Sequence, residues 1–322
     1  MNTKEAIAGL RQVLRRKHLA WSTEQTYTYW LGKYCAWLES RRPAGGSTAK
    51  VTAFLTMLAH TDCSASTQNQ ALQALLMFYR EVVGCDLGRV DALRAKRPQT
   101  IRYAPTRAEV RAILAAVEDR GGYPTRLIVH LLYGCGLRVN EPLDLRLKDV
   151  DLDGSRLTIQ RAKGDKSRVV TLPCALSEPM RRQSAVAVAR WEQDAAAGIP
   201  VPLPNRLGRK YPRNAFARGW YWLFPAVTTC KHPRTGEVVR YRCLDTNVQR
   251  AVRDAAAKCK LAGMVTPHCL RHAYATHALQ AGAYVRDVQI VLGHSSLETT
   301  QGYLHAEAGR VASPLEGMAV VT

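Results

Sequence analysis

Apolar side chains recur at helical spacing along most of the chain, and the first 93 residues show this pattern clearly. One stripe falls at i, i+3, i+4 and i+7, on one face of a helix: Tyr27, Trp30, Leu31, Tyr34, Trp37 and Leu38. Further stripes lie within 4–17, 51–58 and 72–79. We therefore predict a four-helix domain over residues 1–93. Core packing of the aromatic stripe is favoured over base stacking.

A Ser or Thr followed three residues later by Glu or Gln occurs at 22–25, 67–70 and 106–109. This is the capping-box pattern, in which the first side chain accepts from the N3 amide and the last reaches back to the N-cap amide. The pattern predicts helix starts at Ser22, Thr67 and Thr106.

The segment 94–105 interrupts the helical pattern. It holds four basic residues and two prolines without an apolar stripe, which is typical of an interdomain linker. Lying along a phosphate backbone is an equally open role. A second domain is predicted over 106–322, where helical patterns recur at 110–117, 126–133, 177–197, 248–261, 268–281, 285–292 and 296–304.

The period changes from helical to alternating over 156–162 and again over 168–172. The two stretches predict a β-hairpin whose turn contains Gly164. Lys163 and Lys166 would project from its tip, where lysines usually serve solubility. The second domain is therefore mainly helical with one small β element.

Lys and Arg number 46 against 26 Asp and Glu, a net charge of +20 spread along the chain. This excess predicts a polyanionic partner, either nucleic acid or an acidic membrane surface. The sequence has no signal-peptide pattern and no 18-residue apolar run, which favours nucleic acid. The nine cysteines form no CxxC pair, so we expect reduced, mostly buried thiols in a cytoplasm.

Cations and aromatic residues are interleaved with proline and glycine over 200–243. Stacking on unpaired bases requires this combination, because aromatic rings hold the bases and cations hold the backbone. A surface insertion with a small aromatic core of its own fits the composition equally well.

Two histidines, an arginine and a tyrosine are concentrated in the stretch 266–305: His268, Arg271, His294 and Tyr303. Cleaving a phosphodiester without water requires a nucleophile, neutralisation of the transition-state charge and a proton for the leaving oxygen. An arginine fork suits phosphate. His268 and Arg271 are three residues apart at a helix start, so they share a face. These residues predict a phosphoryl-transfer site with Tyr303 as nucleophile.

Competing chemistry has weaker support. His268 and His272 have a zinc-like i, i+4 spacing, but no Glu lies between them as in HExxH and no third ligand is evident. The glycine-rich loops that hold ATP or NAD are incomplete at 163–167 and 134–139. We therefore predict no metal and no cofactor.

Five motifs occur in a fixed order: YGCGLRVNEPLDL, RAKGDKSR, HCLRH, LGH and TTQGYLH. Together they resemble the tyrosine recombinases of the phage-integrase family over nearly the whole chain. The resemblance implies a mainly α fold with a small β-hairpin or sheet, arranged as a two-domain C-shaped DNA clamp. A helical, SAM-like core-binding domain (1–93) and a basic linker (94–105) would precede an α+β catalytic domain (106–322).

The resemblance also implies roles for six residues: Arg138, Lys163, His268, Arg271, His294 and Tyr303. The two arginines would bind the scissile phosphate, and Lys163 would protonate the 5′-oxygen leaving group. The two histidines would transfer a proton and bond the phosphate, and Tyr303 would form a 3′-phosphotyrosyl link. That link retains the bond energy, so rejoining would need neither ATP nor metal. Glu141 would be structural.

A finer resemblance, to the integron integrases, lies in 210–213, 220–225, 233–236 and 311–315. In that subfamily the insertion corresponding to 200–243 engages extrahelical bases of folded single-stranded cassette sites. The predicted DNA contacts are Lys166, Arg168, Arg209, Lys210, Arg213, Trp220, Tyr241 and Arg242. The chain departs from the subfamily at 241–242, where two histidines are usual, and at Gly302, Cys269 and Ala273.

These resemblances predict an enzyme that integrates and excises gene cassettes. Its partners would be duplex attI-like and folded single-stranded attC-like DNA, with a monomer in solution and a homotetramer on DNA. We expect a cytoplasmic, nucleoid-associated protein that does not contact membranes. The alternatives are a Xer-like, phage or transposon recombinase of duplex sites, a catalytically vestigial DNA-binding relative, and a relaxing topoisomerase.

Overall fold

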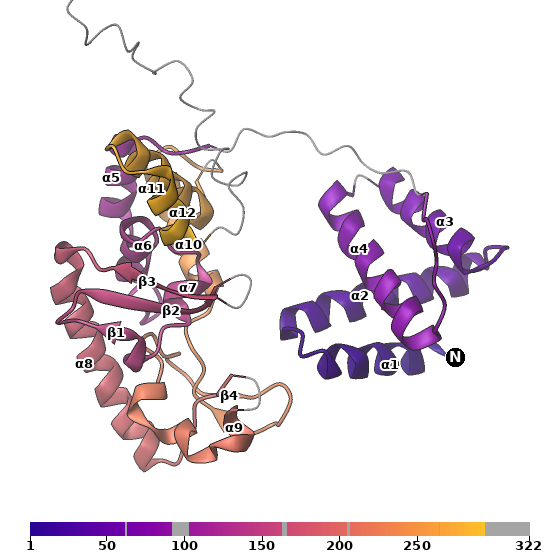
Figure 1. The fold of residues 1–322 in the computed structure, drawn as a ribbon, viewed down its shortest axis with the longest axis horizontal. Coiled ribbons are helices and arrows are strands. Elements are labelled where there is room, and N and C mark those ends of the chain that lie inside the picture. Colours follow the sequence, from indigo (N-terminus) through magenta and orange to yellow (C-terminus); the bar gives the residue numbers. More distant parts are fainter. Residues whose placement is uncertain (62, 92–102, 163–165, 205–206, 264, 294–322) are drawn as a thin grey trace, which may run out of the picture. The chain divides into compact units, whose positions relative to one another are not determined.

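The computed structural model describes residues 1–61, 63–91, 103–162, 166–204, 207–263 and 265–293, except the side chains of 161, 162 and 166. The chain divides into two compact units, Met1–Ile101 and Arg102–Thr322. Figure 1 shows helices dominating both units. Within the described residues, strands occur only in the second unit and form one sheet of three strands and one of two. The predicted mainly α fold with a small sheet is confirmed.

Four helices and a π-helical turn form the first unit: α1 (Thr3–Arg16), α2 (Trp21–Arg41), α3 (Ser47–His60), α4 (Ala65–Phe78) and the turn Tyr79–Val83. The aromatic stripe of α2 lies in its core, as predicted. Tyr34 is 1% exposed, its ring meets Phe54 edge-on, and its hydroxyl lies 2.9 Å from that of Tyr79. Trp30 is buried as well, and Tyr27 and Trp37 are half-buried against the same core, so the stripe packs the helices together.

Two of the three predicted caps in the chain are wrong. α2 begins at Trp21, so Ser22 lies inside its first turn and Ala20 is the N-cap without a side-chain bond. α4 is capped by Ser64, whose Oγ accepts from the Thr67 amide at 3.2 Å. Thr67 is therefore the N3 donor of its helix, because an equally good cap precedes it by three residues.

The helices of the second unit are α5 (Arg107–Ala116), α6 (Thr125–Gly134), α7 (Asn140–Leu143), α8 (Cys174–Ala196), α9 (Leu207–Lys210), α10 (Asp245–Lys258), α11 (Pro267–Gln280) and α12 (Val285–Leu292). Short 3-10 turns cover Leu147–Asp149, Pro212–Phe216 and Arg218–Trp220. The predicted capping box at the start of α5 is confirmed: Thr106 and Glu109 exchange both bonds.

The predicted hairpin is present as β2 (Arg156–Ala162) and β3 (Lys166–Thr171), with β1 (Val150–Asp151) antiparallel on the other edge of β2. Its inner face joins a core formed with α5, α6, α10 and α11. Leu157, Ile159 and Val170 are each at most 2% exposed in that core. The hairpin is therefore held by burial of alternate residues of both strands.

The 200–243 segment contains α9, two of the 3-10 turns and a small ribbon of β4 (Cys230–Lys231) with β5 (Val238–Val239). A buried carboxylate fastens it to the rest of the unit. Asp194 on α8 accepts two bonds from Arg240, at 2.7 and 2.8 Å, and one from the Tyr221 hydroxyl at 2.5 Å. Val201, Tyr221 and Trp222 form a small buried cluster, so the segment has an aromatic core of its own.

All nine cysteines lie among the described residues and are free thiols, as predicted. The expectation that they are mostly buried is wrong, because only Cys135 and Cys243 are buried while Cys174 and Cys230 are exposed. No helix that the structure describes is both long enough and apolar enough to span a membrane.

Candidate active site

A glycine turn fixes Arg138 beside α11. α6 ends at Gly134, and Gly136 follows with a φ of +62°, which disfavours L side chains. A Cβ at Gly136 would lie 2.5 Å from the ring of Tyr274 on α11. The backbone therefore packs directly on α11, and this contact brings Arg138 close to Arg271.

Among the described residues with less than 2% exposure, Arg271 is the largest; it is 1% exposed. Its Nη1 donates to the Gly136 carbonyl at 2.9 Å, and its Nη2 donates to the Leu292 carbonyl. His268 is exposed one turn earlier on α11. The helix starts as predicted, with Thr266 as N-cap and Pro267 in the first turn. The two side chains differ in environment although their spacing is that of one helix face.

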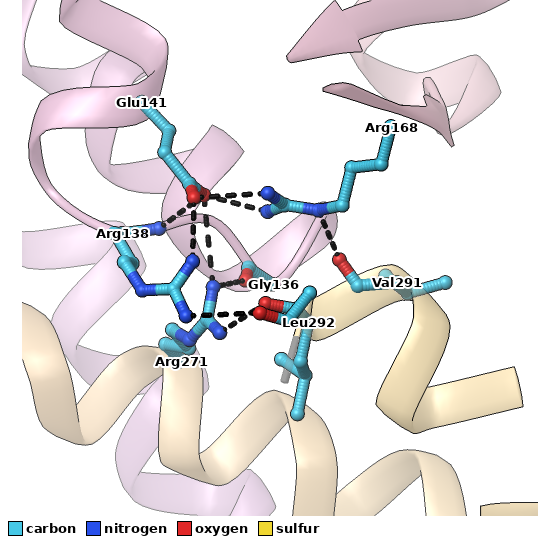
Figure 2. A network of polar contacts seen from close by, with 8 residues as sticks. Gly136, Arg138, Glu141, Arg168, Arg271, Val291 and Leu292 are labelled. Atoms are coloured by element: carbon cyan, nitrogen blue, oxygen red, sulfur yellow. Dashed lines mark hydrogen bonds and ion pairs between the residues drawn. The ribbon is translucent and has the colours of Figure 1, made fainter. Parts of the chain in front are cut away.

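Glu141 joins three guanidinium groups in one network (Figure 2). Its carboxylate accepts from the Arg138 amide and Nη1, both at 2.8 Å, and from Arg168 Nη1 and Nη2 at 2.9 and 2.6 Å. Arg271 Nη1 lies 3.6 Å from the same carboxylate. One negative charge thus holds three positive charges together, with side-chain exposures of 29% for Arg138 and 8% for Arg168.

The same three arginines also bind the end of α12. Three successive carbonyls accept from three different side chains: Val291 from Arg168 Nε at 2.6 Å, Leu292 from Arg271, and Gly293 from Arg138 Nη2 at 3.3 Å. The last carbonyls of a helix have no partner within it and form its negative end. The cluster therefore lies between a carboxylate and a helix C-terminus (Figure 2).

Electrostatics favour the charged form of Glu141. Its burial would raise the carboxyl pKa, but hydrogen bonds and charge from Arg168, the Arg138 amide and the charge of Arg271 outweigh that effect and lower the pKa. Glu141 is therefore ionised at neutral pH, and the net charge of the four side chains stays positive. A site with this charge suits an anion such as a phosphodiester.

Three of the six predicted catalytic residues, Lys163, His294 and Tyr303, lie outside the described residues. Arg138 and Arg271 both contact Glu141, and His268 lies at the start of the same helix as Arg271. Among the side chains that the structure describes, no group of three or more His, Cys, Asp or Glu residues is placed to hold a metal ion.

Two predicted DNA contacts require correction. Arg168 turns inward to Glu141 and Val291, and Arg242 is 13% exposed with its Nε 2.5 Å from Asp144. In both cases a carboxylate of the same chain pairs with the cation; Glu141 is 10% exposed and Asp144 is 54% exposed. The alternation of β3 predicts that Arg168 points inward, since it lies two residues before buried Val170 and therefore on the core face. The side chain of Lys166 lies outside the described part.

The other predicted contacts of the 200–243 segment are at the surface. Arg209, Lys210 and Arg213 are exposed, and Tyr241 is 36% exposed. Trp220 lines a pocket of about 540 Å³. Lys148 and Arg146, both before the hairpin, lie 3.3 and 5.3 Å from the centre of the Trp220 ring.

This Trp220 pocket is lined by Asp144, Arg146, Lys148, Asp149, Gln160, Pro204, Leu207, Trp220 and Trp222. Sequence reasoning missed Arg146, which is 6% exposed. Burial lowers the pKa of Arg146 to about 10, so it remains charged at neutral pH. It stacks 3.8 Å from the centre of the Trp222 ring and donates to Pro202 at 2.8 Å. A single Arg between Leu145 and Leu147 gives no signal of such a role.

Comparison with known proteins agrees with this architecture. The phage integrase family matches residues 106–310, and the N-terminal SAM-like domain of phage integrases matches residues 7–89. An integrase/recombinase of Escherichia coli is 38% identical over all of this chain and 96% of its own length. Tyrosine recombinase XerA of Thermococcus kodakarensis is 33% identical over 87% of this chain and 83% of its own.

The fold also recurs in a solved structure of the Tn1549 transposon integrase in complex with a circular intermediate DNA. That structure has a TM-score of 0.62 at 16% identity and covers 97% of this chain and all of its own. Sequence, fold and the arginine pair agree, and the chain belongs to the phage integrase family as a tyrosine-type site-specific DNA recombinase.

Proposed function

We propose that this recombinase cleaves and rejoins DNA through a tyrosine-linked phosphodiester, with the six residues in the roles that the family resemblance implies. The observation that supports this most directly is the pairing of Arg138 and Arg271 by Glu141 and the end of α12. Two guanidinium groups held close together offer a phosphodiester several directed N–H donors and more than one positive charge.

In the cleavage step, Tyr303 Oη attacks the scissile phosphorus and forms a new O–P bond. The bond between phosphorus and the 5′-oxygen breaks, and Lys163 supplies the proton that this oxygen takes up. His268 accepts the proton of the tyrosine, and His294 donates to a phosphate oxygen. Attack by a 5′-hydroxyl on the phosphotyrosine reverses these changes and rejoins the strand.

The carbonyl oxygens at the end of α12 accept hydrogen bonds from the guanidinium groups. They therefore mark positions at which these groups bind an acceptor oxygen. Arg138 has 29% of its side chain exposed, and its bond to Gly293 is long at 3.3 Å. We infer that a phosphate oxygen takes the place of the Gly293 carbonyl at Arg138 first. Binding would then require only the exchange of one acceptor for a stronger, charged one.

Covalent trapping tests the proposal. The protein is incubated with labelled DNA sites and chelator, denatured, and resolved on a gel; proteolysis and mass measurement locate the modified residue. We expect a denaturant-resistant adduct at Tyr303. An adduct at another residue would reassign the nucleophile, and tight binding without an adduct on either duplex or hairpin sites would favour a vestigial site.

We further propose that the substrates are folded single-stranded cassette sites of the integron type together with duplex attachment sites. The Trp220 pocket supports this, since it combines the partly exposed Trp220 ring with the exposed cation Lys148 and the exposed polar side chain of Gln160. An unpaired base needs an aromatic face, polar partners for its edge and cations for its phosphate. The pocket offers all three.

Trp220→Ala is expected to slow cleavage of folded hairpin substrates about 5- to 150-fold, because one base–aromatic stack contributes about 1–3 kcal/mol. Cleavage of duplex sites should stay within about two-fold of wild type. Phe216→Ala is the matched control, an aromatic residue of the same segment that is 42% exposed and does not line the pocket. If Trp220→Ala slowed cleavage of hairpin and duplex substrates equally, the pocket would have no specific role in binding hairpin sites.

A Xer-like recombinase that acts on duplex sites is the second candidate, favoured by 33% identity to tyrosine recombinase XerA over 87% of this chain. It predicts adducts on duplex DNA alone. For either candidate we propose a cytoplasmic, nucleoid-associated monomer that assembles as a homotetramer on two DNA sites. Sedimentation of the protein with and without its target DNA would test this assembly.

A further inference from the structure

We propose that Arg168 is a positioning residue. Its guanidinium links the β2–β3 hairpin and the end of α12 to Glu141, and this link positions the neighbouring residues Lys163 and His294 for catalysis. Lys163 lies three residues before the start of β3, and His294 directly follows Gly293. This inference rests on the catalytic roles proposed above for those two residues.

Contacts of Arg168 reach three separate elements. Its Nη1 and Nη2 bind both oxygens of Glu141 on α7, and its Nε binds Val291 in the last turn of α12. Its own backbone belongs to β3, paired with Ile159 of β2. One side chain therefore joins hairpin, α7 and α12 with three directed bonds of 2.6 to 2.9 Å.

Gly293 packs against the side chain of Arg168. Its φ of +61° closes α12 in the left-handed conformation that glycine prefers. A Cβ at Gly293 would lie 3.2 Å from Arg168 Nη1 and 3.3 Å from its Cδ. The end of α12 and the arginine are thus in close contact, which leaves little room for a side chain at residue 293.

The chemistry of the network requires arginine and not merely a positive charge. Lysine could keep an ion pair with Glu141, but a single ammonium cannot bind both carboxylate oxygens and the Val291 carbonyl in this fixed geometry. Arg168→Lys should therefore fold and retain the local charge while losing the link between elements. A residue that contacts DNA through charge alone would tolerate the same change.

The first test compares Arg168→Lys with wild type and with Arg156→Lys, the matched control, in which the changed arginine is an exposed residue of β2. We expect Arg168→Lys to slow single-turnover cleavage about 10- to 100-fold, with DNA affinity within about three-fold and the control unchanged. The proposal would be overturned in favour of direct phosphate contact by two results together. Arg168→Lys would cleave at the wild-type rate, and Arg168→Ala would bind DNA more weakly with a smaller salt dependence.

A second test asks whether the loss acts through the proton of Lys163. When sulfur replaces the bridging 5′-oxygen of the substrate, the 5′ leaving group departs as a thiolate. A thiolate needs no proton, because thiols have a pKa of about 8.5. On this substrate the defect of Arg168→Lys should shrink below about three-fold. An equal defect on both substrates would overturn the part of the proposal that concerns the hairpin.

Hydrogen exchange tests the fastening without any reaction, so it remains decisive if the wild-type protein forms no adduct. Arg168→Lys should speed exchange at least about ten-fold in peptides covering 166–171 and 288–293 and leave α6 and α10 unchanged. Unchanged protection in both segments would overturn the proposal, even if cleavage were slow. A failure of the proposed function would appear separately, as a wild-type protein without an adduct.

Discussion

Arg271→Lys is expected to lower the single-turnover rate of DNA cleavage about 100- to 1,000-fold, the usual effect of removing one preorganised donor to a transition-state anion. Arg271 bonds the Gly136 and Leu292 carbonyls and lies beside Glu141 while almost fully buried. A lysine retains the charge but has neither the fork nor the reach to bind these groups and a phosphate oxygen together. The rate is measured with saturating protein on a labelled site.

Arg107→Lys provides the control for this prediction. Arg107 also donates to a backbone carbonyl of α11, that of His277 at 2.8 Å, but from a largely exposed position outside the cluster. It should cleave at close to the wild-type rate. If Arg271→Lys stayed within about three-fold of wild type, Arg271 would be a structural residue and the phosphate would be bound by other groups.

Glu141→Gln is expected to lower the free energy of unfolding of the second unit by about 3–5 kcal/mol, the range seen when one partner of a buried ion pair is removed. Without the carboxylate, Arg138, Arg168 and Arg271 keep three positive charges close together with only neutral acceptors. Hydrogen exchange of buried amides in α6 and α11 measures this unit alone. Activity should fall as well, because the arginines then repel one another.

Glu178→Gln is the matched control. Glu178 is 61% exposed and pairs with Arg182 on the surface of α8, so its loss should cost about 0–1 kcal/mol. Equal and small effects of both substitutions would show that Glu141 does not hold the cluster together.

The effect of Glu141 should also depend on pH. Its folded-state pKa is lowered, so its ionised form contributes stability that is complete above the ordinary glutamate pKa of about 4.3. That contribution is lost as the pH falls through the lower, folded-state value. The stability difference between wild type and Glu141→Gln should therefore be constant near neutrality and shrink below about pH 4. A difference that grew on acidification would contradict this assignment.

Periodicity predicted most helices and the hairpin because those elements are held by burying one face. It could not choose between neighbouring N-caps: Ser64 and Thr67 are both good caps, and only the packing of α4 decides between them. The alternation of β3 places Arg168 on the core face with Val170, but it could not show that Glu141 is its partner. That partner is 27 residues away in sequence.

In the 200–243 segment, too, the sequence indicated the kind of residue but not its position. Its aromatic and basic composition predicted stacking on bases, but Tyr221, Trp222 and Phe224 are buried, while Trp220 lines the pocket. Adjacent aromatic residues in an irregular segment have no period that separates a core position from a surface position. The residues that complete the pocket, such as Arg146 and Gln160, come from elsewhere in the chain.

The anchoring of this segment has a consequence for how such a protein can change over generations. Asp194 and Gln183 on α8 and Arg146 bond groups that belong to residues 200–243. If the segment were lost alone, these buried polar groups would lose their partners, which is costly. The segment and its three anchors outside it must therefore be gained or lost together, and a relative that lacks the segment should have apolar or differently paired residues at those positions.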